Sequence, residues 1–444
     1  MSPAFTVMSY FAIQSALLIF SRPLWQLIFL CDIMITTHPH IHFNGFYRSL
    51  CGNRTKVTKG KCKMQFRDFG KTGVKVSTLG FGCMRLPVIG GATENIDEGQ
   101  TAKLFSKAFE LGVNYWDTAY PYHGYKSEEV TGRVLGKGGI KNDVFIATKL
   151  PTWLAKDKAD LPRLLDEQLK KLGRDYIDFY LMHNPDTARW PALQSADMQN
   201  FIDKAKRDGK IRFAGFSLHD NIHHFKTVLD SYAWDFCQLQ YNYLDVYHQA
   251  GKEGVDLAKE RGVGLVIMEP LKGGRLATGL PDDIAARLKK ENPDCSAAEW
   301  ALRFVLNDDA VSIALSGMNS MEQLLENVEV ATAASCGNLS AGELEMLSEV
   351  RESYLARQKV GCTSCMYCMP CPMGVDIAAS FSRYNAYFAT SDEGAKEKMK
   401  ASFLSFDEQS GPSKCVKCME CISKCPQAIA IPTQLENCAS TFAK

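Results

Sequence analysis

Three ionisable side chains stand at the ends of three consecutive apolar segments. Asp117 follows Tyr115-Trp116, Lys149 ends the segment 144–149, and His183 ends the segment 177–183. If these segments are parallel strands of one sheet, their carboxyl ends meet at one edge, with neighbouring strands about 5 Å apart. A buried ammonium is costly unless it is paired. The spacing therefore predicts an ion pair between Lys149 and Asp117, with His183 beside it.

Tyr122, five positions after Asp117, completes a set that could reduce a carbonyl group. Hydride addition requires a proton on the carbonyl oxygen, and the Tyr122 phenol can supply one. Its ordinary pKa is near 10, and a neighbouring cation lowers it. We therefore expect Lys149, oriented by Asp117, to lower the pKa of Tyr122, and His183 to align the carbonyl oxygen. The alternative is a rim salt bridge with a nearby Tyr and His and no catalytic role.

These residues belong to a repeating pattern of short apolar runs and longer amphipathic stretches. Nearly continuous apolar character indicates strands buried on both faces of a parallel sheet. The predicted strands are 76–82, 114–119, 144–149, 177–183, 211–217, 236–242, 264–270 and 312–318. Eight strand–helix units of this length are typical of an α/β fold, the (β/α)8 TIM barrel. A doubly wound open sheet is the alternative, but Cys83-Met84-Arg85-Leu86-Pro87 after the first strand is not a glycine-rich phosphate loop.

The predicted strand ends and the segments after them contain Asp117-Thr118-Ala119, Tyr122, Ser127-Glu128, Ala147-Thr148-Lys149 and Leu181-Met182-His183-Asn184-Pro185-Asp186. Together these motifs resemble those of the aldo/keto reductase family over about residues 65–335. The resemblance implies a barrel that binds NAD(P)H across its rim and reduces aldehydes or ketones, with Asp117, Tyr122, Lys149 and His183 as the catalytic tetrad. It also implies that residues 64–75 form a hairpin closing the lower end of the barrel.

The resemblance implies a nucleotide site as well. The matching positions are Ser217 and Gln238 for the nicotinamide amide, Met268, Pro270 and Leu271 beside it, Gly273 in the pyrophosphate loop, and Gly317, Gln323 and Asn327 at the adenine end. Gly317 and Gln323 stand where the family has a Lys and an Arg. A 2′-phosphate requires a cationic clamp, so this chain is expected to bind NADH at least as well as NADPH.

A cysteine-dense segment follows the predicted barrel. Eight of the 16 cysteines lie in two runs, Cys362, Cys365, Cys368 and Cys371, then Cys415, Cys418, Cys421 and Cys425. The second run has bacterial ferredoxin spacing, whereas the first has two residues in its last gap instead of three. Both end before a proline. Structural zinc prefers two separated CxxC pairs, so the pattern favours two [4Fe–4S] clusters and resembles a dicluster ferredoxin domain. In that arrangement Cys371 and Cys425 each cross to the other cluster.

The predicted domains are a barrel over 64–335, a linker helix within 336–358 that leads away from the barrel, and an iron–sulfur domain over 359–435. Residues 1–63 carry seven Lys or Arg and one Asp, against 44 and 49 in the remainder. They are interpreted as an untranslated, disordered or targeting extension. A membrane association is expected only if residues 4–35 form an anchor. The near-neutral total charge gives no general attraction to nucleic acid, and the cysteine usage favours a reducing cytoplasm.

Three functions remain open for this fusion. In the first, the barrel reduces a small carbonyl substrate and the clusters are structural or couple to a redox partner protein such as ferredoxin. In the second, the clusters feed electrons into the rim site and the substrate is not a simple carbonyl. In the third, the chain is a non-catalytic nucleotide-sensing subunit, a role suggested by the similarity of potassium-channel β subunits to reductases.

Overall fold

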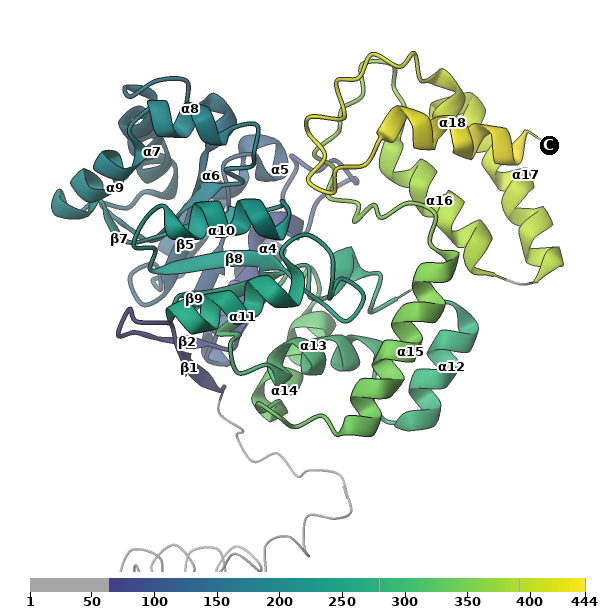
Figure 1. The fold of residues 1–444 in the computed structure, drawn as a ribbon, viewed down its shortest axis with the longest axis horizontal. Coiled ribbons are helices and arrows are strands. Elements are labelled where there is room, and N and C mark those ends of the chain that lie inside the picture. The colour runs from purple at the N-terminus through teal and green to yellow at the C-terminus, as the bar shows by residue number, and fades with distance from the viewer. Residues whose placement is uncertain (1–63, 279, 391, 444) are drawn as a thin grey trace, which may run out of the picture. The chain divides into compact units, whose positions relative to one another are not determined.

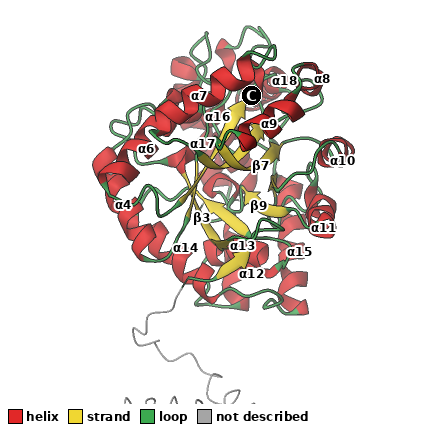
Figure 2. Cartoon of the chain, turned by 90° about the vertical axis from the view of Figure 1, so that its left-hand side faces the viewer, coloured by secondary structure: helices red, strands yellow, loops and turns green. Residues whose placement is uncertain are grey.

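The computed structural model of the chain describes residues 64–278, 280–390 and 392–443. The predictions for residues 1–63 lie outside the described residues. Eight parallel strands close a barrel in the order β10-β3-β4-β5-β6-β7-β8-β9, with helices around it (Figure 2). The strands are β3 (Leu79–Gly82), β4 (Tyr115–Asp117), β5 (Phe145–Pro151), β6 (Ile177–His183), β7 (Ile211–Leu218), β8 (Phe236–Gln240), β9 (Gly264–Met268) and β10 (Ile313–Ser316). The predicted TIM barrel is confirmed.

A hairpin precedes the barrel and closes one of its ends. Its antiparallel strands are β1 (Phe66–Asp68) and β2 (Lys75–Ser77). Phe69, between them, is fully buried among inward-facing aromatic rings and lies 5.0 Å from Phe179 and 5.3 Å from Phe236 between ring centroids. Such edge-on and tilted contacts are favourable for aromatic pairs. The hairpin therefore acts as an apolar plug at the end of the barrel opposite the strands' carboxyl ends.

Helices cover the outside of the strands because each carries one apolar stripe, as in α7, which buries five leucines against the sheet. The helices up to β10 are η1 (Cys83–Arg85), α4 (Glu98–Glu110), α5 (Tyr122–Tyr125), α6 (Ser127–Lys137), η2 (Thr152–Leu154), α7 (Asp160–Leu172), α8 (Trp190–Ser195), α9 (Met198–Arg207), α10 (Ile222–Asp230), α11 (Gly251–Arg261), η3 (Lys272–Gly274), α12 (Asp282–Glu291) and α13 (Ala297–Asn307). Figure 1 shows α10 and α11 beside β8 and β9.

Two helices follow the last strand, α14 (Met321–Ala333) and α15 (Ala341–Arg357). Ser340 and Glu343 form a reciprocal capping box at the start of α15. The expectation that this helix leads away from the barrel is wrong. Met346, Leu347 and Val350 of α15 are buried in one apolar cluster with Trp300 of α13. This helix is therefore anchored on the barrel by apolar contact before the cysteine-dense segment begins.

The cysteine-dense segment folds with three further helices, α16 (Ile377–Ala389), α17 (Glu393–Ser410) and α18 (Ile431–Phe442), and the short η4 (Pro412–Lys414). These helices gather at the C-terminal part of the chain (Figure 1). Phe381, Phe403 and Phe442 are buried in an apolar cluster of their own. We call residues 359–443 the cysteine module, since they have a core separate from that of the barrel.

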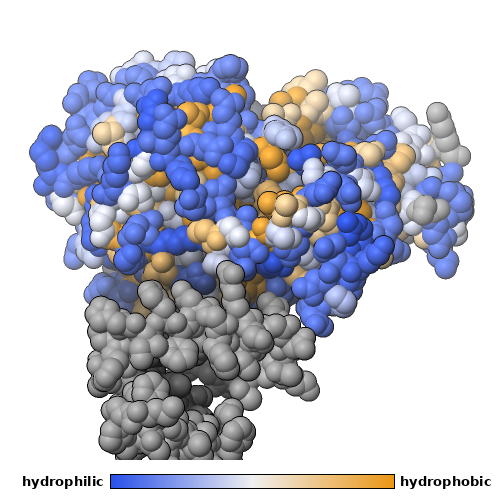
Figure 3. All heavy atoms as spheres, turned by 60° about the horizontal axis from the view of Figure 1, so that its bottom comes forward, coloured by the Kyte–Doolittle hydropathy of each residue, from blue (hydrophilic) through white to orange (hydrophobic). Residues whose placement is uncertain are grey.

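The outer surface is largely polar. Hydrophilic side chains predominate on the described face shown in Figure 3, with apolar side chains scattered between them. Within residues 64–278, 280–390 and 392–443, every helix falls short of the length and apolar character that crossing a membrane requires.

Candidate active site

The four residues of the expected tetrad converge at the carboxyl ends of three adjacent strands. The ammonium of Lys149 lies 2.5 Å from Asp117 Oδ1, 2.9 Å from the carbonyl oxygen of Thr118 and 3.2 Å from the Tyr122 hydroxyl. The ring of His183 lies 6.3 Å from that of Tyr122 between centroids. The three donors of the ammonium thus each have an acceptor, which offsets the cost of burying its charge.

A strained turn sets the position of Tyr122. His123 and Gly124, directly after it, both adopt left-handed backbone conformations. The His123 ring holds this turn, because its Nε2 accepts a hydrogen bond of 3.0 Å from the Leu86 amide and its Nδ1 lies 2.6 Å from the Thr93 carbonyl oxygen. Backbone strain of this kind persists where surrounding contacts over-determine it. The only signal for His123 in the sequence is its position next to Tyr122.

The electrostatics of Tyr122 differ from the expectation. Burial first, and the carboxylate of Asp117 second, raise the pKa of Tyr122 well above its usual value. A side-chain hydrogen bond with Tyr367 and the charge of Arg85 oppose this rise in pKa. The expectation that Lys149 lowers the pKa of this phenol is wrong here, since burial dominates and the ammonium is already paired with Asp117. Tyr122 is therefore a neutral phenol, the form that a proton donor requires.

His183 is also held neutral. Burial first, and the charge of Lys149 second, lower the pKa of His183 well below its usual value. Its Nδ1 is buried and has no hydrogen-bond partner among the described residues. Its ring packs against Trp153, at 5.2 Å between centroids. A neutral imidazole in this position can donate one hydrogen bond to a ligand while adding no charge.

These four residues line a cavity of about 80 Å³. Of the nucleotide residues expected from the sequence, those that line it are Ser217, Gln238, Met268 and Gly317. Gln238 donates to Asp117 Oδ2 at 3.4 Å, but its buried Oε1 has no partner among the described residues. An unsatisfied buried acceptor is costly, and a primary amide could donate to it. The cavity wall therefore fits the amide end of a nicotinamide.

The other expected nucleotide residues do not line this cavity. Asn327 donates to Ser316 Oγ at 2.8 Å, and the Gln323 side chain accepts from the Asn319 amide at 3.0 Å. Pro270 is buried and Leu271 packs into the apolar core. The side-chain amides of Asn327 and Gln323 are thus occupied by contacts that stabilise the loop after β10 and the start of α14.

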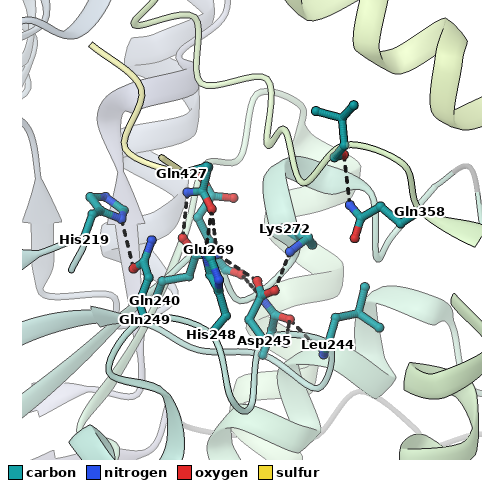
Figure 4. A network of polar contacts seen from close by, with 12 residues as sticks. His219, Gln240, Leu244, Asp245, His248, Gln249, Glu269, Lys272, Gln358 and Gln427 are labelled. Atoms are coloured by element: carbon teal, nitrogen blue, oxygen red, sulfur yellow. Dashed lines mark hydrogen bonds and ion pairs between the residues drawn. The ribbon is translucent and has the colours of Figure 1, made fainter. Parts of the chain in front are cut away.

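The expected pyrophosphate loop, Lys272-Gly273-Gly274, is also engaged within the protein. Lys272 is buried and pairs with Asp245 at 2.5 Å, as Figure 4 shows. Gly273 adopts a left-handed conformation, and a Cβ built on it would lie 2.3 Å from the carbonyl oxygen of Thr363. Only glycine tolerates so close an approach. The main chain of the cysteine module therefore lies against this loop.

The eight clustered cysteines surround two separate cavities. Cys362, Cys365, Cys368 and Cys425 line one of them. The other is lined by Cys371, Cys415, Cys418 and Cys421, together with Cys368, which borders both cavities. None of the eight is in a disulfide. The last cysteine of each run thus crosses to the cavity of the other run, as the ferredoxin arrangement requires.

The two cysteine runs share one backbone conformation. Ser364 and Lys417, each two positions after the first cysteine of its run, have left-handed backbones, as do Met366 and Met419 after the second cysteine. In the first run the Ser364 amide donates to Cys362 Sγ at 3.3 Å. Hydrogen bonds to sulfur are a feature of iron–sulfur sites. The two loops therefore share one backbone form, and the first also places an amide donor at a cysteine sulfur.

The cysteine module also forms part of the wall of the active-site cavity. Thr363, Cys365, Tyr367, Pro426 and Gln427 line it together with the tetrad. The Gln427 side chain donates to Gln240 at 2.9 Å and accepts from His248, at 3.2 Å (Figure 4). Apart from Cys365, which is expected as a cluster ligand, these residues have no signal in the sequence that would assign them to this site.

Polar contacts on both sides of the cavity join the barrel to the module. Arg85 donates to the Thr363 carbonyl oxygen at 3.2 Å, and Gln249 donates to that of Pro426, also at 3.2 Å. Arg189 donates to the Ser423 carbonyl oxygen at 3.2 Å. Most of these contacts reach the segments next to Cys362, Cys365 and Cys425. The cysteine set that approaches the barrel is therefore the one that contains Cys365.

Comparisons with known proteins agree with this geometry. The chain is 29% identical over 307 residues to L-galactose dehydrogenase from Arabidopsis thaliana, which covers 65% of the chain and 93% of that protein. It is 27% identical over 308 residues to a putative voltage-gated potassium channel subunit beta from Schizosaccharomyces pombe, covering 60% and 87%. The holo form of an aldo-keto reductase from Bacillus halodurans is 28% identical and has a TM-score of 0.55, covering 65% and 96%.

Family models match both parts of the chain. The model of the 4Fe-4S dicluster domain matches residues 361–430, which contain all eight clustered cysteines. The model of the aldo/keto reductase family matches residues 78–351, from the first barrel strand into α15. Because this match spans more than half of the chain and includes the four converging residues, the protein is an oxidoreductase of the aldo/keto reductase family with a C-terminal 4Fe-4S dicluster domain.

Proposed function

We propose that the protein reduces a small aldehyde or ketone with NADH or NADPH at the site formed by Asp117, Tyr122, Lys149 and His183. The observation that carries this proposal is the position of the Lys149 ammonium, 2.5 Å from a carboxylate oxygen of Asp117 and 3.2 Å from the Tyr122 hydroxyl. This arrangement lines a cavity whose wall fits a nicotinamide amide.

Each residue has a separate task in carbonyl reduction. A bound reduced nicotinamide supplies a hydride to the carbonyl carbon. The neutral Tyr122 hydroxyl gives its proton to the carbonyl oxygen. Lys149, already within hydrogen-bond distance, stabilises the negative charge left on Tyr122, and Asp117 holds Lys149 in place. Neutral His183 donates a hydrogen bond that orients the carbonyl oxygen.

The nicotinamide amide would be held by Gln238 Oε1, with Ser217 beside it in the cavity wall. The substrate is proposed to be a small hydroxylated carbonyl compound, since one relative is named for its action on a sugar. A reducing cytoplasm is the proposed location, because a cysteine-dense metal-binding motif is more typical of that compartment than a disulfide framework. Ferredoxin is the proposed type of partner if the module exchanges electrons with another protein.

The module is proposed to hold two [4Fe–4S] clusters. Cys362, Cys365, Cys368 and Cys425 would bind the first, which we call the inner cluster because its ligand set approaches the barrel. Cys371, Cys415, Cys418 and Cys421 would bind the outer cluster. Bound clusters supply single-electron transfer, and their assembly also contributes folding free energy.

The test uses full-length protein purified without oxygen. We expect about eight irons and eight sulfides per chain and oxidation of NADH that depends on an added small aldehyde such as glyceraldehyde. Four irons, or stoichiometric zinc, would contradict the two-cluster proposal. Absence of aldehyde-dependent NADH and NADPH oxidation across a panel of small aldehydes and ketones would contradict the reductase proposal.

One observation favours a second candidate, in which the clusters deliver the electrons. Cys365, an inner-cluster ligand in this scheme, lines the same cavity as Tyr122. Reduction of one substrate would then consume one electron from each cluster and two protons. Protein reduced with dithionite and freed of excess reductant should reduce the aldehyde without nucleotide if this candidate is correct. Strict dependence on NADH or NADPH would exclude it.

A further inference from the structure

Tyr367 lies between two proposed ligands of the inner cluster and belongs to the active-site cavity. It stands between Cys365 and Cys368 in the sequence, in the segment that approaches the barrel. It lines the cavity together with Asp117, Lys149 and Gln238. A loop that binds a cluster thus also places a phenol over the catalytic residues of another domain.

The contacts of Tyr367 are made with the two residues that face the carbonyl oxygen in the proposed reaction. Its ring centroid lies 6.4 Å from that of Tyr122 and 6.4 Å from that of His183. The Tyr122 and Tyr367 rings are tilted by 35° to each other, and hydrogen bonding to Tyr367 is one of the influences that lower the pKa of Tyr122. The Tyr122 hydroxyl is therefore placed between Lys149 on the barrel side and Tyr367 on the module side.

Contacts of neighbouring residues hold the loop that carries Tyr367 against the barrel. Four residues before it, the Thr363 carbonyl oxygen accepts from Arg85 and lies against Gly273. On the other side of the cavity, Gln427 is hydrogen-bonded to Gln240. The inner cluster would join these two segments, because Cys365 belongs to the first and Cys425 lies two positions before Gln427. Cluster assembly would thus hold both walls of the cavity.

We propose that Tyr367 is a positioning residue for the catalytic site: it holds the Tyr122 hydroxyl in line with the carbonyl oxygen, so that the reductase site is complete only when the inner-cluster loop is assembled. This inference rests on the proposed carbonyl reduction. It assigns the inner cluster a role that requires no electron transfer, because the cluster shapes the loop that carries Tyr367. Loss of that cluster would then impair a reaction in which the iron takes no part.

The chain offers a matched control for the test. Tyr387 of α16 is also a module tyrosine, but its ring packs on Phe388 and Phe442, at 5.3 Å and 5.0 Å. Tyr367→Phe and Tyr387→Phe each remove one hydroxyl and keep the ring. Both variants would be prepared without oxygen as full-length protein, and their iron content would be measured before any assay.

We expect Tyr367→Phe to retain full iron content and full NADH affinity. Its kcat for glyceraldehyde should fall about 10-fold with little change in KM. The solvent deuterium isotope effect on kcat should increase, because a misplaced donor makes proton transfer slower. Tyr387→Phe should match the wild-type protein. Wild-type values of kcat and of the isotope effect in Tyr367→Phe would overturn the proposal. A decrease in kcat that is fully explained by a proportional loss of iron would overturn it as well.

A second measurement does not depend on turnover. We expect Tyr367→Phe, and not Tyr387→Phe, to speed amide hydrogen exchange in residues 120–126 several-fold, because the strained turn after Tyr122 loses a contact. Unchanged exchange would also overturn the proposal. If the wild-type protein reduces no aldehyde but the exchange rates change as expected, the contact stands and the failure lies with the proposed reaction.

Discussion

The ammonium of Lys149 lies 2.5 Å from a carboxylate oxygen of Asp117, and both side chains are almost completely removed from solvent. Each charge is buried only because the other is present. Breaking such a pair by removing one partner leaves an uncompensated buried charge, which costs far more than losing a surface contact. The pair therefore holds the barrel rim together as well as positioning Tyr122.

Removing one charge of this pair should destabilise the barrel. We expect Asp117→Asn to lower the free energy of unfolding by about 3–5 kcal/mol and to abolish carbonyl reduction. Asp68→Asn is the control, because it breaks an exposed pair with Lys75 at 2.8 Å and should cost less than about 1 kcal/mol. Denaturant unfolding followed by tryptophan fluorescence measures both. Equal costs in the two variants would contradict the role given to the buried pair.

Tyr122→Phe should remove the proton donor while the nucleotide site remains. We expect kcat for carbonyl reduction to fall at least about 100-fold and the NADH dissociation constant to change little. The control is Tyr125→Phe, which changes an exposed side chain three positions further along the same turn. Its kcat and its NADH dissociation constant should be close to the wild-type values. Stopped-flow kinetics and fluorescence titration measure the two quantities. Near-normal turnover by Tyr122→Phe would refute its assignment.

Nucleotide choice should favour NADH or be neutral. Gln323 supplies no charge, and its side chain accepts a hydrogen bond from the Asn319 amide. We expect NADH to bind at least as well as NADPH at low salt, and Gln323→Arg to increase NADPH affinity selectively. Leu325→Arg places the same charge at an exposed position of the same helix and should act weakly. A tenfold preference of the wild-type protein for NADPH would show that another cation reaches the phosphate.

Cys425→Ser should damage both clusters, because Cys425 crosses from its own run to the cavity of the other. We expect iron per chain to fall by more than half and hydrogen exchange in residues 359–435 to increase, while the barrel stays folded. Cys336→Ser changes an exposed cysteine outside both runs and should leave iron content unchanged. Retention of more than half of the iron by Cys425→Ser would indicate that the two sites assemble independently.

The activity should show no histidine ionisation near neutral pH. The lowered pKa keeps His183 neutral in the folded protein as the pH falls through about 6.5, where an exposed imidazole takes up a proton. The unfolded chain binds that proton and the folded chain does not, so the free energy of unfolding should decrease below this pH. We expect a flat kcat/KM between pH 8 and 6. An ionisation near 6.5 that disappears in His183→Asn would contradict the neutral state.

The sequence was sufficient to predict the barrel and the convergence of the tetrad. A parallel strand buried on both faces is mostly apolar along its length, so the run 177–183 coincides with β6 even though it contains Asp178. Because parallel strands end at one rim, Asp117, Lys149 and His183 could be placed together from their positions alone. Proximity did not determine the pKa of Tyr122, however. Burial opposes its ionisation, and the degree of burial depends on the complete cavity.

The part of the cavity wall that the cysteine module forms could not be predicted, because it depends on how two domains contact each other. Thr363, Tyr367 and Gln427 belong to loops whose own sequence explains only their cysteines. Their contacts with Arg85 and Gln240 follow from the anchoring of α15 on the barrel, through Met346 and its neighbours. One sequence signal was available, since the first run has Tyr367 at the position where the second run has Glu420.

That difference between two loops of the same backbone has a consequence for oxygen damage. In the outer set, Cys418 is exposed, and so is Glu420 beside it, whereas no cysteine of the inner set is fully exposed. Oxygen and other small oxidants would therefore reach a cluster held by the outer set first. In air, we expect the iron to leave in two phases, and the first phase to spare Tyr367 and its contacts. The outer cluster would thus be lost before the contacts around the active-site cavity change.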